Sequence, residues 1–147
     1  MYKKCTLMLF STAGALALGA TVAMAAGWRP YGNTSPITSG WACGTTRRVT
    51  DNETVLGQVC TVRSADRRFV TGAVIVRNNN SFLYSTSAGV TLFYPNGNRK
   101  GHWSCSLSGV AANSWSVCFG TTVPANGDSY YTYGYANTRS LLYSPTN

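Results

Sequence analysis

Hydrophobic and polar residues alternate with a period of two along most of the chain beyond Trp41, which is the spacing of side chains on the two faces of a β-strand. Turn residues such as Asn, Gly and Pro separate these segments. The candidate strands cover residues 44–50, 54–63, 68–78, 82–94, two segments around Trp103 and Trp115, 129–136 and 140–144. Seven or eight such strands predict an all-β fold, an antiparallel, immunoglobulin-like β-sandwich over residues 41–147.

The turn residues also predict which neighbouring strands pair. Residues 44–50 and 54–63 are expected to form a first hairpin. Residues 68–78 are expected to join 82–94 through three asparagines at 78–80, which tolerate positive φ. The runs Trp103-Ser-Cys105 and Trp115-Ser-Val-Cys118 are expected to lie on two strands joined by a turn that includes Asn113.

Some of these strands carry apolar residues on both faces. On the 54–63 strand, Val55 and Val59 lie on one face, while Leu56, Cys60 and Val62 lie on the other. Such a strand is expected to be covered on both sides. In the last tryptophan segment, Trp115, Val117 and Phe119 share one apolar face, and Ser114, Ser116 and Cys118 share the opposite one.

Residues 1–25 have the pattern of a signal peptide. Lys3 and Lys4 precede an apolar run over 7–22, and small residues at Ala23 and Ala25 suit cleavage after Ala25. The run is too short to be a membrane span. The mature protein is therefore expected to be secreted, and Cys5 is expected to leave with the leader.

Four cysteines remain: Cys43, Cys60, Cys105 and Cys118. An even set of four in a secreted protein predicts two disulfides. A turn midway between Cys43 and Cys60, at Asp51-Asn52, would put these two cysteines opposite each other, which favours the pairs Cys43–Cys60 and Cys105–Cys118. The alternative is inter-sheet pairing of Cys43 or Cys60 with Cys105 or Cys118.

Positive charge predominates in the chain. Twelve Lys and Arg residues stand against four Asp and Glu, and loss of Lys3 and Lys4 with the leader leaves ten basic residues. This balance suits an anionic surface as a partner, although solubility alone also accounts for it. The pairs Arg47-Arg48, Arg67-Arg68 and Arg99-Lys100 lie near turns, and solvated strand ends explain them better than nucleic-acid binding, since no stacking aromatics are interleaved with them.

Catalytic and metal-binding residue types are sparse. His102 is the single histidine, the cysteines are assigned to disulfides, and no Gly-x-Ser-x-Gly motif occurs. A ribonuclease would have to use His102 with Glu53 and an arginine, but an acidic residue is ordinary in the turn that contains Glu53. No catalytic residue, metal ligand or cofactor is therefore assigned.

Two aromatic segments are candidates for binding a partner. Residues 26–40 lack strand or helix periodicity and are expected to form an extended N-terminal arm, in which Trp28, Arg29, Pro30 and Tyr31 contact another secreted protein. A frayed terminus, or packing on the protein's own domain, is the alternative. Tyr131, Tyr133 and Tyr135 share one face of a strand, with Tyr130 on the other, and offer either a contact surface or a cover for the edge of the core.

The chain resembles small four-cysteine secreted proteins of actinobacteria. The residues that carry the resemblance are the leader, Trp28-Arg29-Pro30, Trp41-Ala-Cys43, Gln58-Val-Cys60, the 74–78 strand, Cys105 and Val117-Cys-Phe-Gly120. The layout looks like the adaptor subunit of the umbrella-shaped toxin particles that these bacteria secrete. In that family a small β-domain joins a large toxin-bearing protein to lectin-like subunits, and an N-terminal extension contributes to the joint.

We therefore expect a secreted, non-catalytic protein-binding or adaptor domain. The alternatives are a secreted enzyme inhibitor or a small antibacterial effector, and, less favoured, a carbohydrate-binding module that would use Trp103, Trp115 or the tyrosines. A carbohydrate-binding module requires exposed, coplanar rings.

Overall fold

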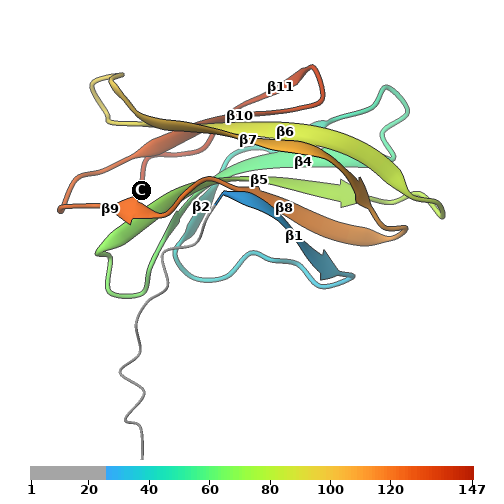
Figure 1. The fold of residues 1–147 in the computed structure, drawn as a ribbon, viewed down its shortest axis with the longest axis horizontal. Helices are drawn as coiled ribbons and strands as arrows, with labels where there is room; N and C mark the ends of the chain where they lie inside the picture. The colour runs from blue at the N-terminus through green and yellow to red at the C-terminus, as the bar shows by residue number, and fades with distance from the viewer. Residues whose placement is uncertain (1–25) are drawn as a thin grey trace, which may run out of the picture.

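Two antiparallel β-sheets face each other in the computed structural model, which describes residues 26–147 (Figure 1). The expected signal peptide lies outside the described residues. Among residues 26–147 there is no helix that could cross a membrane. The predicted all-β sandwich is confirmed, with eleven strands in the described part of the chain because several short strands escape a sequence pattern.

Sheet A has seven strands in the order β1-β8-β5-β4-β2, with the short β3 beside β4 and β9 beside β5. Its strands are β1 (Gly27–Gly32), β2 (Trp41–Cys43), β3 (Arg47–Arg48), β4 (Val55–Arg63), β5 (Phe69–Asn78), β8 (Ser114–Phe119) and β9 (Val123–Pro124). Sheet B has the order β11-β10-β6-β7. Its strands are β6 (Tyr84–Phe93), β7 (Arg99–Val110), β10 (Tyr131–Ala136) and β11 (Arg139–Tyr143).

Two of the expected strand pairings are wrong, because the chain changes sheet where a hairpin was expected. Strand β5 lies in sheet A and β6 in sheet B, and β7 and β8 are likewise divided between the sheets. The turn before β8 does contain Asn113, with a φ of 49°. It connects the two layers instead of two neighbouring strands of one layer.

Asn78 explains why the 78–80 segment is a crossing between layers. Its side chain is fully buried, and its amide donates to the carbonyl oxygens of Phe82 (2.8 Å) and Val110 (2.9 Å). Its side-chain oxygen accepts from the backbone N–H of Asn80 at 3.0 Å. The expected positive φ is absent from residues 78–80. The asparagine is instead needed to satisfy backbone groups where three strands end.

The interior between the sheets is filled by apolar side chains from both layers. The main cluster includes Val59 and Val74 of sheet A and Val90 of sheet B. Gly134 of β10 marks a close approach of the layers, since a Cβ there would lie 2.5 Å from Cγ2 of Val74. A second group at one end contains Leu92 and the fully buried Tyr130.

The outer face of sheet A is also apolar and buried. Its cluster contains Cys60, Ile75, Val117 and Phe119, with Trp41 packed against it. The predicted apolar face of the 115–119 segment is therefore buried, but on the side away from sheet B. The expectation that β4 is covered on both sides is confirmed, because Val59 lies in the interior and Cys60 in this outer cluster.

Residues 33–40 cross the outer face of sheet A. Strands β1 and β2 are at opposite edges of sheet A, so the segment between them has to cross the sheet (Figure 1). At about 4.8 Å per strand, the crossing spans on the order of 19 Å. Pro36 in the middle of the segment is buried.

Residues 27–32 of the expected extended arm form edge strand β1 of sheet A, so the sandwich begins before the predicted boundary at residue 41. Trp28 is opposite Cys118 in the β1–β8 ladder and donates its indole N–H to the carbonyl of Ser106 on β7 at 2.7 Å. The ring packs against the interior cluster. Tyr31, at a bulge in the ladder, packs against the outer cluster. Apolar burial on both sides of β1 makes it part of the sandwich, as the packed alternative anticipated.

Both favoured disulfides are present. Cys43 and Cys60 are direct partners in the β2–β4 ladder, with Cα atoms 4.0 Å apart. Cys105 and Cys118 have Cα atoms 5.9 Å apart and connect β7 of sheet B to β8 of sheet A. The second bridge therefore joins the layers, where a bridged hairpin was expected. Loops of this size contribute about 3 kcal/mol each in the chain-entropy account.

Replacing Trp28 with Ala should lower the free energy of unfolding by about 2 kcal/mol, because a half-buried indole and its hydrogen bond to Ser106 are lost. Chemical denaturation followed by tryptophan fluorescence and circular dichroism measures the change. Pro30→Ala is the control on the same strand, since Pro30 is exposed and its replacement should change stability by less than about 0.5 kcal/mol. Equal stability of both variants would show that β1 contributes nothing to the sandwich.

The two disulfides should differ in their accessibility to a mild reductant under native conditions. Cys43 is partly exposed, whereas Cys105 and Cys118 are 3% and 0% exposed. Partial reduction followed by alkylation and peptide mass spectrometry should label Cys43 and Cys60 first. Simultaneous labelling of all four cysteines would contradict this order.

Candidate functional site

The outer face of sheet B carries several partly exposed aromatic side chains. Tyr131, Tyr133 and Tyr135 point outward from β10 and are partly exposed, whereas Tyr130 is fully buried on the other side. The predicted division of these tyrosines between two faces is confirmed. Backbone pairing fixes the three outward rings on a central strand of the sheet.

Two further rings join this surface through strand register. Phe93 of β6 is opposite Tyr131, and Tyr143 of β11 is opposite Tyr133. Tyr143 is 53% exposed. The sequence analysis did not include Phe93 and Tyr143, because the side chains beside them depend on which strands pair. We call Phe93, Tyr131, Tyr133, Tyr135 and Tyr143 the aromatic face.

The rings of the aromatic face pack against one another. Phe93 and Tyr131 are stacked, with centroids 5.3 Å apart and an interplanar angle of 15°. Tyr143 lies 5.8 Å from Tyr131 and 5.2 Å from Tyr133, at interplanar angles of 62° and 53°. These contacts restrict the side-chain rotamers, so the surface is preorganised.

Tyr135 lies across β6. Its ring occupies the space above Gly89, where an added Cβ would lie 2.3 Å from Cζ of Tyr135. A glycine within a strand often marks such a close approach. Gly89 was therefore the one feature of the sequence that could have indicated a ring packed across β6. The ring is thereby held flat and half-buried.

Polar side chains of β7 border the aromatic face. His102 is opposite Thr91, and the hydroxyl of Thr91 is 2.7 Å from Nδ1 of His102. Arg99 is opposite Phe93. An apolar centre with a polar margin is the usual arrangement of a protein-contact surface.

A sugar-stacking platform fits this geometry less well. Stacking on a sugar ring requires open, coplanar aromatic faces, but Phe93 and Tyr131 cover each other and Tyr143 is steeply inclined to its neighbours. Trp103 is partly buried against the interior, and the guanidinium of Arg77 lies over Trp115 at 5.3 Å from the ring centroid. The two tryptophans are therefore not coplanar partners of the tyrosines.

The four residues proposed as contacts in the arm have different surroundings. Trp28 and Tyr31 pack on the sandwich. Arg29 places its guanidinium 5.4 Å from the ring centroid of Phe119, and Pro30 is exposed. Their part in holding a partner stays a prediction.

The structure does not bring His102 and Glu53 together. Glu53 lies in the turn before β4 of sheet A, where it forms an ion pair with Arg48. His102 is on the outer face of sheet B. The ribonuclease interpretation required both side chains to act on one substrate, and this arrangement does not support it.

The predicted pairs of basic residues divide between the ends of the sandwich. Arg67-Arg68 precedes β5, and Arg99-Lys100 begins β7, so these two pairs lie at one end. Arg47-Arg48 lies on β3, opposite Gly57 and Leu56 near the other end of β4. Convergence of all three pairs, considered from the sequence, is therefore not observed.

A buried guanidinium anchors the end that carries Arg67-Arg68. Arg63 donates to the backbone carbonyls of Asp128 and Asn147, the latter at 2.8 Å. Its guanidinium lies 5.6 Å from the ring centroid of Tyr130. Burial, and then the nearby charge of Arg67, lower the pKa of Arg63.

No family model, curated protein or solved structure matches this chain. The function therefore has to be argued from the surfaces described above.

The buried Tyr130 should make stability fall at high pH. Burial is the main cause that raises its pKa to about 12, against an ordinary value of 10.0, and nearby Tyr94 and Asp128 act in the same direction. The neutral phenol is favoured by folding, so this stabilisation is complete below pH 10 and is lost as the pH rises through about 12. The free energy of unfolding should fall by on the order of 2–3 kcal/mol from this group.

Urea unfolding at pH 9 and at pH 11.5 tests this dependence. Tyr130→Phe is the matched variant, since it keeps the ring and removes both the titrating hydroxyl and its 3.0 Å hydrogen bond to the carbonyl of Ala125. It should be less stable than wild type at pH 9 but lose less stability between the two pH values. An identical loss in both proteins would assign the effect to other groups.

Proposed function

We propose that this protein is a secreted, non-catalytic protein-binding or adaptor domain, and that the aromatic face holds its partner. The single observation that supports this most is the row of mutually packed, part-exposed rings on the outer face of sheet B. On the outer face of sheet A the apolar cluster is buried beneath side chains such as Tyr31 and Trp41, whereas the rings of the aromatic face stay partly exposed.

The chemistry of the rings suits a protein partner. Tyrosine combines a large apolar area with a hydroxyl that can form a hydrogen bond, and it loses little side-chain entropy on binding. Aromatic residues and Arg are enriched at the centres of protein interfaces. The aromatic face supplies the rings, and Arg99 and His102 supply polar groups at its margin.

Secretion is supported by two observations. The two disulfides are typical of an oxidising compartment, and the leader pattern of residues 1–25 is that of a chain exported to one. The adaptor role draws on the resemblance to small four-cysteine actinobacterial proteins. On that resemblance the partner is a large toxin-bearing protein or a lectin-like subunit of a toxin complex.

Strand β1 has a secondary role in this proposal. It is an edge strand, and edge strands can accept an added strand from another chain. Pro30 removes one backbone donor from that edge and so limits strand addition. Arg29 and Pro30 are therefore the arm residues whose contribution can be tested without disturbing Trp28 or Tyr31.

Replacing Tyr131, Tyr133 and Tyr143 together with Ala should abolish capture of the partner. The experiment is a pull-down from the culture supernatant of the producing organism with tagged wild-type and variant proteins, and mass spectrometry identifies the captured protein. Binding of the purified pair is then measured by calorimetry. Loss of three interface rings should weaken binding at least 100-fold, since each such ring typically contributes more than about 1 kcal/mol.

Phe82→Ala is the matched control, because Phe82 is an exposed ring (64%) just before β6, away from the aromatic face. It should leave capture unchanged. An Arg29→Ala, Pro30→Ala variant measures the contribution of β1. Undiminished binding by a folded triple-tyrosine variant would reject the aromatic face, and loss only in the β1 variant would transfer the contact to the arm residues.

A further inference from the structure

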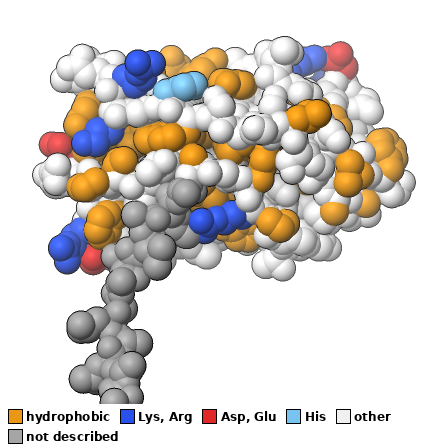
Figure 2. Space-filling view, viewed as in Figure 1, with side chains coloured by type: hydrophobic (Ala, Val, Ile, Leu, Met, Phe, Trp, Pro, Cys, Tyr) orange, Lys and Arg blue, Asp and Glu red, His pale blue; other side chains and the backbone are white. Residues whose placement is uncertain are grey.

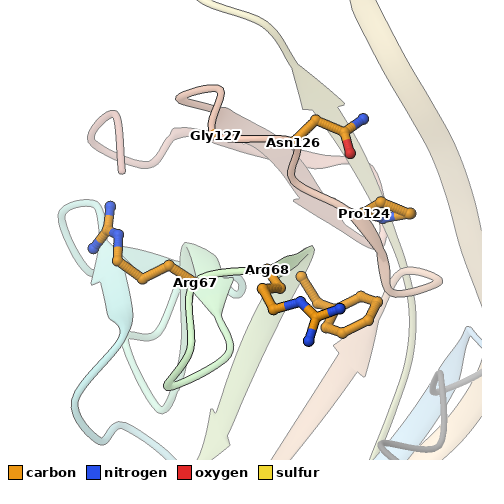
Figure 3. Close-up of a pocket in the computed structure, with 6 residues that line it drawn as sticks. Arg67, Arg68, Pro124, Asn126 and Gly127 are labelled. Atoms are coloured by element: carbon orange, nitrogen blue, oxygen red, sulfur yellow. The ribbon is translucent and has the colours of Figure 1, made fainter.

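A cleft of about 390 Å³ opens at the basic end of the sandwich. One wall is the turn that carries Arg67 and Arg68, and the opposite wall is formed by Pro124, Asn126 and Gly127 (Figure 3). Phe69 completes the lining. The volume is within the range of about 300–1,000 Å³ that small-ligand sites occupy.

The two walls are held together by the fold. Phe69 and Pro124 are partners in the β5–β9 ladder, and the backbone N–H of Ala125 donates to the carbonyl of Arg68 at 2.8 Å. Arg63 connects the walls a second time, because it donates to the carbonyl of Asp128 and, at 3.5 Å, to that of Arg67. The cleft is therefore preorganised rather than formed between independent loops.

Positive charge is concentrated at this end. Five basic residues lie here: Arg63, Arg67, Arg68, Arg99 and Lys100. Two acidic residues, Asp66 and Asp128, stand against them. Figure 2 shows Lys and Arg side chains gathered at the end of the molecule where Figure 1 places β9.

The acidic residues compensate this charge only in part. Asp66 is engaged by its own turn, accepting from the hydroxyl of Ser64 at 2.5 Å and from the backbone N–H of Arg68 at 3.1 Å. The ion pairs found within residues 26–147 join Asp51 to Arg139 and Glu53 to Arg48, around the opposite end. Arg67 and Arg68 are exposed and line the cleft, and their side chains extend in different directions (Figure 3).

We propose that this cleft binds a phosphate group of a linear polyol-phosphate polymer, the chemistry of an anionic wall or surface polymer. Guanidinium groups match phosphate oxygens in charge and geometry. Asn126 on the opposite wall carries an amide that can hydrogen-bond a polyol hydroxyl, and Phe69 with Pro124 supplies apolar surface for the carbon chain. Further phosphates along the polymer would meet the remaining charge of the basic end.

Single-stranded nucleic acid fits the same cleft less well. Proteins that bind it provide a series of aromatic rings on which successive bases stack. Phe69 is the one aromatic residue that lines this cleft. The proposal is separate from the protein-binding function of the aromatic face and does not depend on it.

Fluorescence anisotropy with a labelled glycerol-phosphate oligomer of about ten units tests the site. The purified protein is compared with an Arg67→Gln, Arg68→Gln variant, which should bind at least ten-fold more weakly. Arg47→Gln, Arg48→Gln is the matched control, because it removes the same charge from a similar pair near the other end of the sandwich, and its affinity should change less than two-fold. Asn126→Asp adds a negative charge to the opposite wall and should also weaken binding several-fold.

Thermal denaturation checks that each variant is folded. If the Arg67→Gln, Arg68→Gln variant is unfolded, the Asn126→Asp variant still tests the cleft. Equal losses for the two arginine variants would show attraction by net charge alone and would overturn the proposal. Absence of binding by the wild-type protein at physiological salt would also overturn it. Tighter or equal binding of a single-stranded oligonucleotide with the same number of phosphates would reject the assignment to polyol phosphate.

Discussion

Sheet A carries apolar side chains on both of its faces, and the rest of the structure follows from the need to cover both. Sheet B covers the inner face, where Val59 and Val74 meet Val90. The outer face, with Ile75, Val117 and Phe119, is packed against side chains that include Tyr31 and Trp41, and residues 33–40 cross it between β1 and β2. This solution requires β1 and β2 to lie at opposite edges of one sheet. It also explains why residues 27–32 of the expected extended arm are part of the sandwich.

The same constraint makes the two outer faces of the sandwich unequal. The outer surface of sheet A is occupied by the crossing segment and by Trp41, whose ring meets Phe119 at 5.7 Å. Within residues 26–147 no comparable segment crosses the outer surface of sheet B, and its aromatic residues contact each other instead. A set of rings that is stable in water yet still half exposed can exchange part of its hydration for a partner at little conformational cost.

Local structure could be predicted from the sequence better than topology. Alternation located the long strands β4, β5, β6 and β10, because side-chain direction in a strand depends only on position along the chain. Pairing between strands is non-local. The sequence therefore did not predict that the chain passes from one sheet to the other after β5 and again after β7. The midpoint argument succeeded for Cys43 and Cys60, which are ladder partners. It reached the right partners for Cys105 and Cys118 through a hairpin that does not exist.

The candidate site shows the same division. The period of two placed Tyr131, Tyr133 and Tyr135 together, but Phe93 and Tyr143 depended on the order β11-β10-β6 and could not be found from spacing. The basic pairs could be found in the sequence. The end of the sandwich at which each pair lies depends on strand direction and could not be predicted. Strand β1 was not predicted, because a segment with Pro and Gly at its positions has no alternating pattern, and only the apolar surfaces on both sides of β1 make it a strand.

An adaptor has to hold two partners in a fixed relation, and this fold separates two kinds of surface on one rigid body. The aromatic face is on the outside of sheet B, whereas the basic cleft is formed by β9 and the start of β5 in sheet A. The Cys105–Cys118 bridge connects the two sheets directly. A partner bound by the rings and an anionic polymer bound at the cleft would then be held on one body whose layers cannot separate, because a covalent bond joins them. Rigidity between the sheets, more than any single contact, is what would let so small a domain connect a protein to a charged surface.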